Sequence, residues 1–278
     1  MHPTDDLTDR QRAVLDFIQA HAASEGAPPT LQHCFAAGRA HGDRIFLVHE
    51  DERVSFEGFA RATIRLADHL RSLGVQQGDR IAIAMRNVPE WPVAFYAGQL
   101  VGAIVTPLNA WWTGAELEYG LSDSGAKLLV TDGERWERIA PHRAALPDLK
   151  HVLVSRGGDG SLEAVIGTPE TWGDLPDVPT PAPFLNPDDD ATIFYTSGTT
   201  GKPKGALGSH RNICSNVMAG AFSGARSFLR RGEMPPQPDP AALERVRTGL
   251  RAARIYEQDS AHGRAYDYGI GIHRSRYQ

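Results

Sequence analysis

The sequence predicts an α/β protein with a parallel sheet arranged in βαβ layers. Short apolar segments alternate along the chain with helical segments of roughly ten to fifteen residues. Two apolar segments, at residues 81–85 and 128–130, contain no polar residue, which is typical of strands covered by helices on both faces. The connections between such strands are expected to be right-handed crossovers. The hydrophobic content of 41% and charged content of 23% are ordinary for a globular chain.

The individual elements are expected in a regular order from Thr30, which is a candidate N-cap for a first helix. Strands are expected at residues 46–48, 53–56, 78–85, 102–109, 127–131 and 151–154. Helices are expected at residues 57–73, from 87–91 onward, and at 116–124. Residues 156–190 are rich in Gly, Pro and Asp, so we expect a connection across the surface before a second sheet begins at Ala191.

The N-terminal residues predict a separate helix at 7–22. Thr8 is a plausible N-cap, and Gln11 stands where a capping box needs it. Residues 7–30, beginning Leu7-Thr-Asp-Arg-Gln-Arg, resemble the first helix of the winged-helix domain of the LexA repressor. The recognition helix that should follow for DNA reading is not identifiable. A surface helix is therefore the simpler interpretation of this segment.

The most informative segment runs from residue 192 to 205. Residues 192–195 are β-branched or aromatic and favour a buried strand. A run of hydroxyl residues, glycines and lysines follows, namely Thr196, Ser197, Gly198, Thr199, Thr200, Gly201, Lys202 and Lys204. Exposed backbone N–H groups, hydroxyl donors and positive charge are the groups that bind a polyphosphate. Gly205 adds a further position where the backbone can approach a ligand or take positive φ. These residues therefore predict a phosphate-binding loop.

The order of residues excludes the common P-loop, because Pro203 follows Lys202 where that motif needs Ser or Thr. The string Tyr195-Thr-Ser-Gly-Thr-Thr-Gly-Lys-Pro-Lys-Gly205 instead resembles the signature loop of the adenylate-forming enzymes. Residues 30–225 resemble, within that superfamily, the fatty acyl-CoA synthetases. A segment of theirs, Asn-Ala-Trp-Trp-Thr-Gly, stands here at residues 109–114. The resemblance places the chain in the N-terminal portion of the large domain of those enzymes.

This resemblance implies ATP-dependent activation of a carboxylic acid, with Mg²⁺ and with coenzyme A as the co-substrate that accepts the acyl group. Thr196, Ser197, Thr199 and Thr200 would hold the β- and γ-phosphates, and Lys204 is the more characteristic of the two lysines. The reaction passes through a state rich in negative charge, so catalysis would consist mainly of positioning and electrostatic neutralisation. No catalytic residue and no protein ligand to the metal is assigned.

Three further motifs of the resembled family have no counterpart in the sequence. They are a Tyr-Gly-x-Thr-Glu motif for adenine and metal, a Thr-Gly-Asp motif for the ribose, and a C-terminal lysine that drives adenylation. We therefore expect a truncated enzyme that is inactive alone. The expected organisation is an N-terminal helix at 1–29, a first α/β subdomain at 30–185, the start of a second at 186–228, and a Pro-rich linker with an atypical tail at 229–278.

Two other functions stay open on the sequence alone. One is a non-catalytic remnant or binding module folded around residues 30–185. The other is DNA binding through the LexA-like start and the tail, where residues 243–278 hold seven Arg against four acids. The net charge of −5 gives no sign of bulk attraction to nucleic acid. Two distant cysteines suggest a reducing cytoplasm, and no apolar run is long enough to span a membrane.

Overall fold

The computed structural model describes residues 28–157, 159–196 and 202–216, with the single residues 20, 24 and 26. Almost all of the predicted helix at 7–22, most of the LexA-like stretch, and all of residues 229–278 lie outside the described residues. The chain divides into two compact units. The larger unit comprises Leu31–Leu185 and Asp189–Gly208, and it contains the elements described below except where stated.

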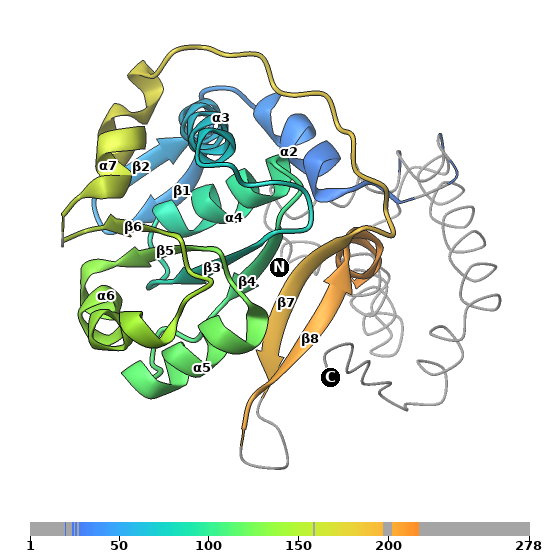
Figure 1. Cartoon of the computed structure of the whole chain (residues 1–278). Coiled ribbons are helices and arrows are strands. Elements are labelled where there is room, and N and C mark those ends of the chain that lie inside the picture. The colour runs from blue at the N-terminus through green and yellow to red at the C-terminus, as the bar shows by residue number, and fades with distance from the viewer. Residues whose placement is uncertain are drawn as a thin grey trace, which may run out of the picture. The chain divides into compact units, whose positions relative to one another are not determined.

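The centre of the larger unit is a six-stranded sheet in the order β6-β5-β3-β4-β7-β8 (Figure 1). The strands are β3 (Arg80–Ala84), β4 (Ile104–Pro107), β5 (Leu128–Asp132), β6 (His151–Ser155), β7 (Asp190–Thr196) and β8 (Lys204–Ser209, whose last residue belongs to the smaller unit). The pairs β3–β4, β3–β5, β4–β7 and β5–β6 are all parallel. Strand β8 turns back alongside β7. The predicted α/β class and the largely parallel sheet are confirmed.

Helices cover both faces of this sheet, with α3 and α4 on one side and α5 and α6 on the other (Figure 1). The helices are α2 (Leu31–Arg39), α3 (Phe56–Ser72), α4 (Glu90–Leu100), α5 (Gly114–Ser124), α6 (Gly133–Ile139) and α7 (Ser161–Ile166). Two 3-10 helices, η2 (Ala140–Ala145) and η3 (Pro169–Asp174), and an antiparallel hairpin of β1 (Ile45–His49) and β2 (Glu52–Ser55) complete the unit. The expected strands and helices between residues 45 and 155 are therefore present.

The two strands that the sequence predicted to be covered on both faces form the middle of the core. Ile81, Ala82 and Ile83 of β3 are fully buried, as are Leu128, Leu129 and Val130 of β5. A strand can bury consecutive side chains in this way only when apolar layers lie on both sides of the sheet. The prediction for these two segments is confirmed.

Local sequence fixes the start and end of α5, the helix that matters most for the site. Thr113 and Glu116 form a capping box, in which the Thr113 N–H donates to Glu116 Oε2 at 2.8 Å and the Glu116 N–H donates to Thr113 Oγ1 at 3.4 Å. Gly125 ends the helix in the left-handed region at φ 61°. The helix consequently begins two residues before the predicted boundary and ends where the sequence places it.

The expectation of a second sheet from Ala191 was wrong. Strand β7 joins the sheet that is already formed, by parallel pairing of Thr192 with Val105 of β4. Ala191 and Thr192 are fully buried there. The residues of a strand indicate that it is buried, but they do not show which open edge it will join. The structure supplies that information.

The expectation that residues 156–190 only cross the surface was also wrong. This segment contains α7 and η3, and Leu162, Ile166 and Trp172 are fully buried. Helix α7 packs on β6 and α3, and η3 packs on α3 and β2. The many Gly and Pro residues concealed these two short elements, because each element is too brief to show a helical period.

Gly98 of α4 gives a direct test of the packing between that helix and the sheet. A Cβ atom at Gly98 would lie 2.6 Å from Val105 Cγ2 on β4. We expect Gly98→Ala to lower the free energy of unfolding by about 1–3 kcal/mol, because the packed core must shift to admit a methyl group. Urea unfolding measures this difference. Gly173→Ala is the matched control, since a Cβ there meets nothing within 4 Å, and an equal loss in both variants would contradict the packing.

Candidate phosphate-binding site

The predicted phosphate loop connects the end of β7 to the start of β8. Its stem residues Thr196, Lys202 and Lys204 are described, whereas Ser197, Gly198, Thr199, Thr200 and Gly201 lie outside the described residues. Because β7 is parallel to β4, the loop leaves the sheet at its carboxyl edge. In open α/β sheets, ligands bind outside the carboxyl ends of the strands. The fold therefore places the loop at a ligand-binding edge.

The two ends of the loop meet at the sheet. The hydroxyl of Thr196 donates to the carbonyl of Lys204 over 3.5 Å, so the two described stems of the loop are neighbours. Gly205 follows Lys204, and the structure shows why a glycine is needed at this position. A Cβ there would lie 2.8 Å from Ile193 Cγ2, and Gly205 does not take positive φ. Close contact with β7 therefore requires this glycine.

The two lysines at the site carry charge that no described carboxylate neutralises. Lys202 and Lys204 are both exposed, and neither forms an ion pair with an acid among residues 28–157, 159–196 and 202–216. The ammonium of Lys202 instead lies 5.4 Å from the centroid of the Tyr119 ring, in a cation–π contact. A pair of cations next to a segment rich in hydroxyl groups and glycines fits an anionic ligand such as a polyphosphate.

Helix α5 supplies site residues that the sequence analysis missed. Tyr119 donates its hydroxyl to the carbonyl of Pro203 at 3.1 Å. Asp123, one turn later, accepts from the hydroxyl of Tyr195 at 2.7 Å. Tyr119 and Asp123 are four residues apart, which puts both on one face of the helix. That spacing was the available signal, but nothing in the sequence shows that the face meets the loop.

The environment of Tyr195 keeps its hydroxyl neutral. Burial raises the pKa of Tyr195 far above its ordinary value, and the carboxylate of Asp123 raises it further. Trp112 packs edge-on against the Tyr195 ring at 5.6 Å, and both rings lie against the core cluster that includes Leu117 and Leu121. Tyr195 is therefore a fixed hydrogen-bond donor, which makes it suitable for holding the first stem of the loop.

The neighbouring tryptophan behaves differently. Trp111 is 70% exposed, with the Arg86 guanidinium 4.0 Å above its ring. Its backbone N–H donates to the Asn109 side chain at 2.9 Å. The sequence favoured ordinary aromatic packing for Trp111 and Trp112, and the structure shows Trp112 against the core and Trp111 on the surface.

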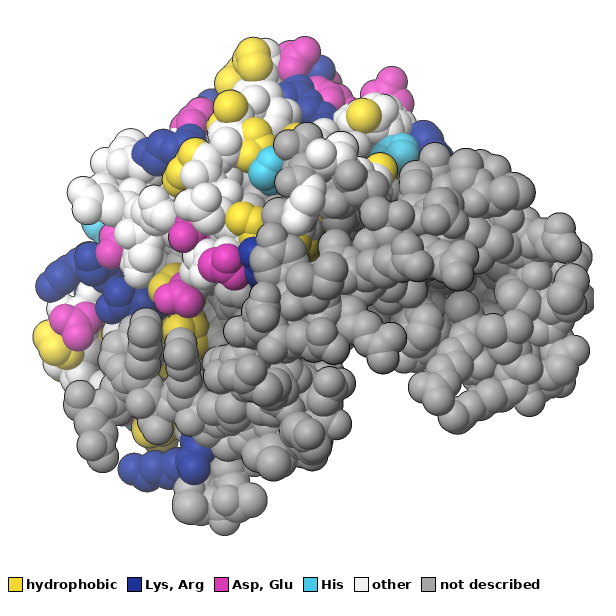
Figure 2. Space-filling model, turned by 90° about the vertical axis from the view of Figure 1, so that its right-hand side faces the viewer, with side chains coloured by type: hydrophobic (Ala, Val, Ile, Leu, Met, Phe, Trp, Pro, Cys, Tyr) yellow, Lys and Arg dark blue, Asp and Glu magenta, His cyan; other side chains and the backbone are white. Residues whose placement is uncertain are grey.

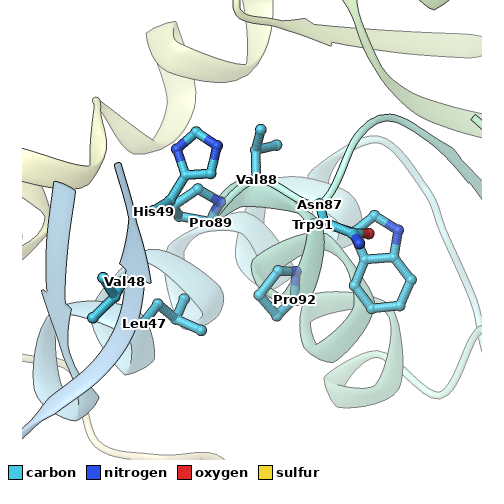
Figure 3. Close-up of a pocket in the computed structure, with 8 residues that line it drawn as sticks. All are labelled: Leu47, Val48, His49, Asn87, Val88, Pro89, Trp91 and Pro92. Carbon is cyan, nitrogen blue, oxygen red and sulfur yellow. The ribbon is translucent and has the colours of Figure 1, made fainter. Parts of the chain in front are cut away.

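A separate pocket of about 250 Å³ lies between the end of β1 and the start of α4 (Figure 3). Its walls are Leu47, Val48, His49, Asn87, Val88, Pro89, Trp91 and Pro92. His49 is hydrogen-bonded through Nδ1 to Glu52 at 3.0 Å, and no lysine or arginine is among the described residues that line the pocket. A mostly apolar wall without positive charge does not suit a triphosphate. The loop between β7 and β8 is the better phosphate site.

The acidic run at residues 188–190 lies before and at the start of β7. Asp190 is the first residue of that strand, and Asp189 accepts from the Gln77 amide at 3.4 Å. Within the smaller unit, Asp188 pairs with Arg211 at 2.6 Å, which lowers the pKa of Asp188. Among the residues that the structure describes, no group of three or more His, Cys, Asp or Glu could hold a metal ion.

The charges on the surface and the length of the helices bear on two other possible partners, nucleic acid and a membrane. Figure 2 shows one face of the molecule, and on its described part acidic and basic side chains lie next to one another. Nucleic-acid binding is typically marked by a patch of basic side chains alone. None of the described helices is both long and apolar enough to cross a membrane.

Comparison with known proteins gives consistent results. A family model described as "AMP-binding enzyme" matches residues 34–233. The chain is 30% identical to an acetyl-coenzyme A synthetase from Nostoc linckia, over 60% of this chain and 55% of that protein. It is 30% identical to 4-coumarate–CoA ligase 2 from rice, over 68% of this chain and 35% of that protein.

Among solved structures, a long-chain-fatty-acid-CoA ligase from Archaeoglobus fulgidus superposes with a TM-score of 0.58 at 27% identity. The match covers 70% of this chain and 40% of that one, so the chain spans about half or less of the proteins it matches. The family model itself covers more than half of the chain, and the protein therefore belongs to the AMP-binding enzyme family.

Proposed function

We propose that this chain binds the triphosphate of ATP at the loop between β7 and β8, as the N-terminal part of an ATP-dependent acyl-CoA ligase. The observation that carries the proposal is the pair of lysines at the carboxyl edge of the sheet, Lys202 and Lys204, which form no ion pair with a described carboxylate. The adjoining hydroxyl and glycine residues, Thr196 to Gly201, add the donors that phosphate oxygens need.

The proposed roles follow the chemistry of the residue types. Thr196, Ser197, Thr199 and Thr200 hold the β- and γ-phosphates by hydrogen bonds, and Gly198 and Gly201 admit the phosphates close to the backbone. Lys202 and Lys204 neutralise the charge that grows as pyrophosphate leaves. Mg²⁺ bound together with the triphosphate would supply further neutralisation and would be held largely by the substrate and water.

The substrate class follows from the relatives. The names of the two curated relatives describe coenzyme A ligation of acetate and of 4-coumarate, and both acids are small carboxylic acids. We propose a carboxylic acid as substrate, of the fatty-acid type by resemblance, and coenzyme A as acceptor of the activated acyl group. The acyl chain itself is not assigned.

We further propose that these 278 residues, expressed alone, do not turn over ATP. The sequence has no match to the adenine, ribose and lysine motifs named above. Binding of the triphosphate would then depend on the loop alone, because the groups that grip the adenosine side are lacking. Inorganic tripolyphosphate should consequently bind about as well as ATP, whereas AMP should not bind.

The test is calorimetry of the full chain with Mg²⁺, using ATP, tripolyphosphate and AMP in separate titrations. We expect similar dissociation constants for ATP and tripolyphosphate, and no heat from AMP. Pyrophosphate release with a panel of fatty acids should stay at background. Failure of both triphosphates to bind would overturn the proposed site and favour the non-catalytic remnant. Turnover that Lys204→Ala abolishes would overturn the proposed inactivity.

A further inference from the structure

Helix α5 holds both ends of the candidate loop. On the first stem, the Tyr195 hydroxyl donates to Asp123 at 2.7 Å and reaches the carbonyl of Gly120 at 3.3 Å. On the second stem, the Tyr119 hydroxyl donates to the carbonyl of Pro203 at 3.1 Å. These contacts join residues 72 to 84 positions apart in the chain. One turn of α5 is therefore a common anchor for the two strands that carry the loop.

Tyr119 has a second contact with the same stem. The Lys202 ammonium lies 5.4 Å from the centroid of the Tyr119 ring, while the Tyr119 hydroxyl is bonded to the next residue, Pro203. A lysine side chain in water samples many rotamers. When a ligand binds and fixes the side chain in one rotamer, the side chain loses conformational entropy. A ring that already limits this motion reduces that cost.

We propose that Tyr119 is a positioning residue for the phosphate loop. Its hydroxyl fixes the backbone at Pro203, and its ring holds the Lys202 ammonium near the site. The inference depends on the proposed function, because it assigns Tyr119 to the same triphosphate. Tyr119 acts through Lys202 and Pro203 and is not assigned a contact with the ligand.

Two substitutions separate the two parts of this role. Tyr119→Phe removes the hydrogen bond but keeps the ring, so tripolyphosphate binding should weaken roughly five-fold, as expected for one hydrogen bond. Tyr119→Leu removes the ring as well, and a further loss of about two- to five-fold should follow from the cation–π contact. Calorimetry with Mg²⁺ and tripolyphosphate measures both. Tyr96→Phe is the matched control, because the Tyr96 ring packs among the rings of Phe35, Phe59 and Phe95.

A double-mutant cycle distinguishes positioning from general destabilisation. In a Lys202→Met background, Tyr119→Leu should bind tripolyphosphate as well as Tyr119→Phe does, because no ammonium remains for the ring to hold. The loss caused by Tyr119→Phe should persist, since Pro203 is unchanged. If Tyr119→Leu remains weaker than Tyr119→Phe by the same factor in both backgrounds, the assigned role of the ring is refuted.

The outcomes for this inference and for the proposed function are separable. If the unaltered chain binds neither ATP nor tripolyphosphate, the proposed function fails. If the unaltered chain binds tripolyphosphate and Tyr119→Phe binds it equally well, only the positioning role fails. Thermal unfolding of each variant shows whether it is folded, and amide hydrogen exchange at Lys202, Lys204 and Gly205 gives a second readout. Faster exchange there in Tyr119→Phe, with the rest of the unit unchanged, is the expected result, and unchanged exchange would contradict the anchor.

Discussion

Lys204→Ala is expected to weaken tripolyphosphate binding about ten- to a hundredfold, the range for losing one charge-assisted hydrogen bond. The residue is exposed at the first position of β8, and it has no carboxylate partner among the described residues. Its removal therefore breaks no ion pair in that part of the chain, so stability should change by no more than about 0.5 kcal/mol. Calorimetry with Mg²⁺ and tripolyphosphate measures the affinity, and urea unfolding checks the stability.

Lys150→Ala is the matched control for this charge change. Lys150 is also exposed, but it lies just before β6, at the amino edge of the parallel sheet, where its ammonium donates to the carbonyl of Pro147 at 2.7 Å. Its loss should leave the affinity within about two-fold, since a distant exposed charge is screened by salt. An equal loss in both variants would indicate general attraction by positive charge and would contradict a specific site at the loop.

The sequence predicted those parts of the fold that depend on local pattern. The apolar runs around Ile81 and Leu128 became the buried centre of the sheet, and the helix expected at 116–124 is present as α5. These features are readable because the relevant residues are close together in the chain. The choice of partner for β7 was not readable, because the pairing of Thr192 with Val105 joins distant segments.

The candidate site was predictable to the same extent. The loop residues are a prediction from their chemistry, since hydroxyls, glycines and lysines in one run indicate a phosphate ligand. The residues that anchor the loop were missed, because Tyr119 and Asp123 look like ordinary helix residues until α5 is placed beside β7. The chemistry of a loop is thus local in the sequence, whereas its positioning is a property of the tertiary structure.

Trp172→Ala is expected to lower the free energy of unfolding by about 3–5 kcal/mol, the usual cost of removing a fully buried tryptophan. Trp172 is 0% exposed, and its 3-10 helix η3 packs on α3 and β2. The indole N–H lies 3.4 Å from the carbonyl of Gly167, so the ring also orders the connection before it. The sequence placed this residue in a surface connection, which would predict almost no effect.

The matched control for that substitution is Trp111→Ala, which removes the same side chain from a position that is 70% exposed. The contact with Arg86 is lost there, so the expected cost is about 0.5–1 kcal/mol. Urea unfolding of both variants gives the two differences, with an unchanged slope showing that each variant still unfolds as the same cooperative unit. If Trp172→Ala costs no more than Trp111→Ala, then η3 does not pack into the core, and the connection at residues 156–190 is the surface segment that its composition suggested.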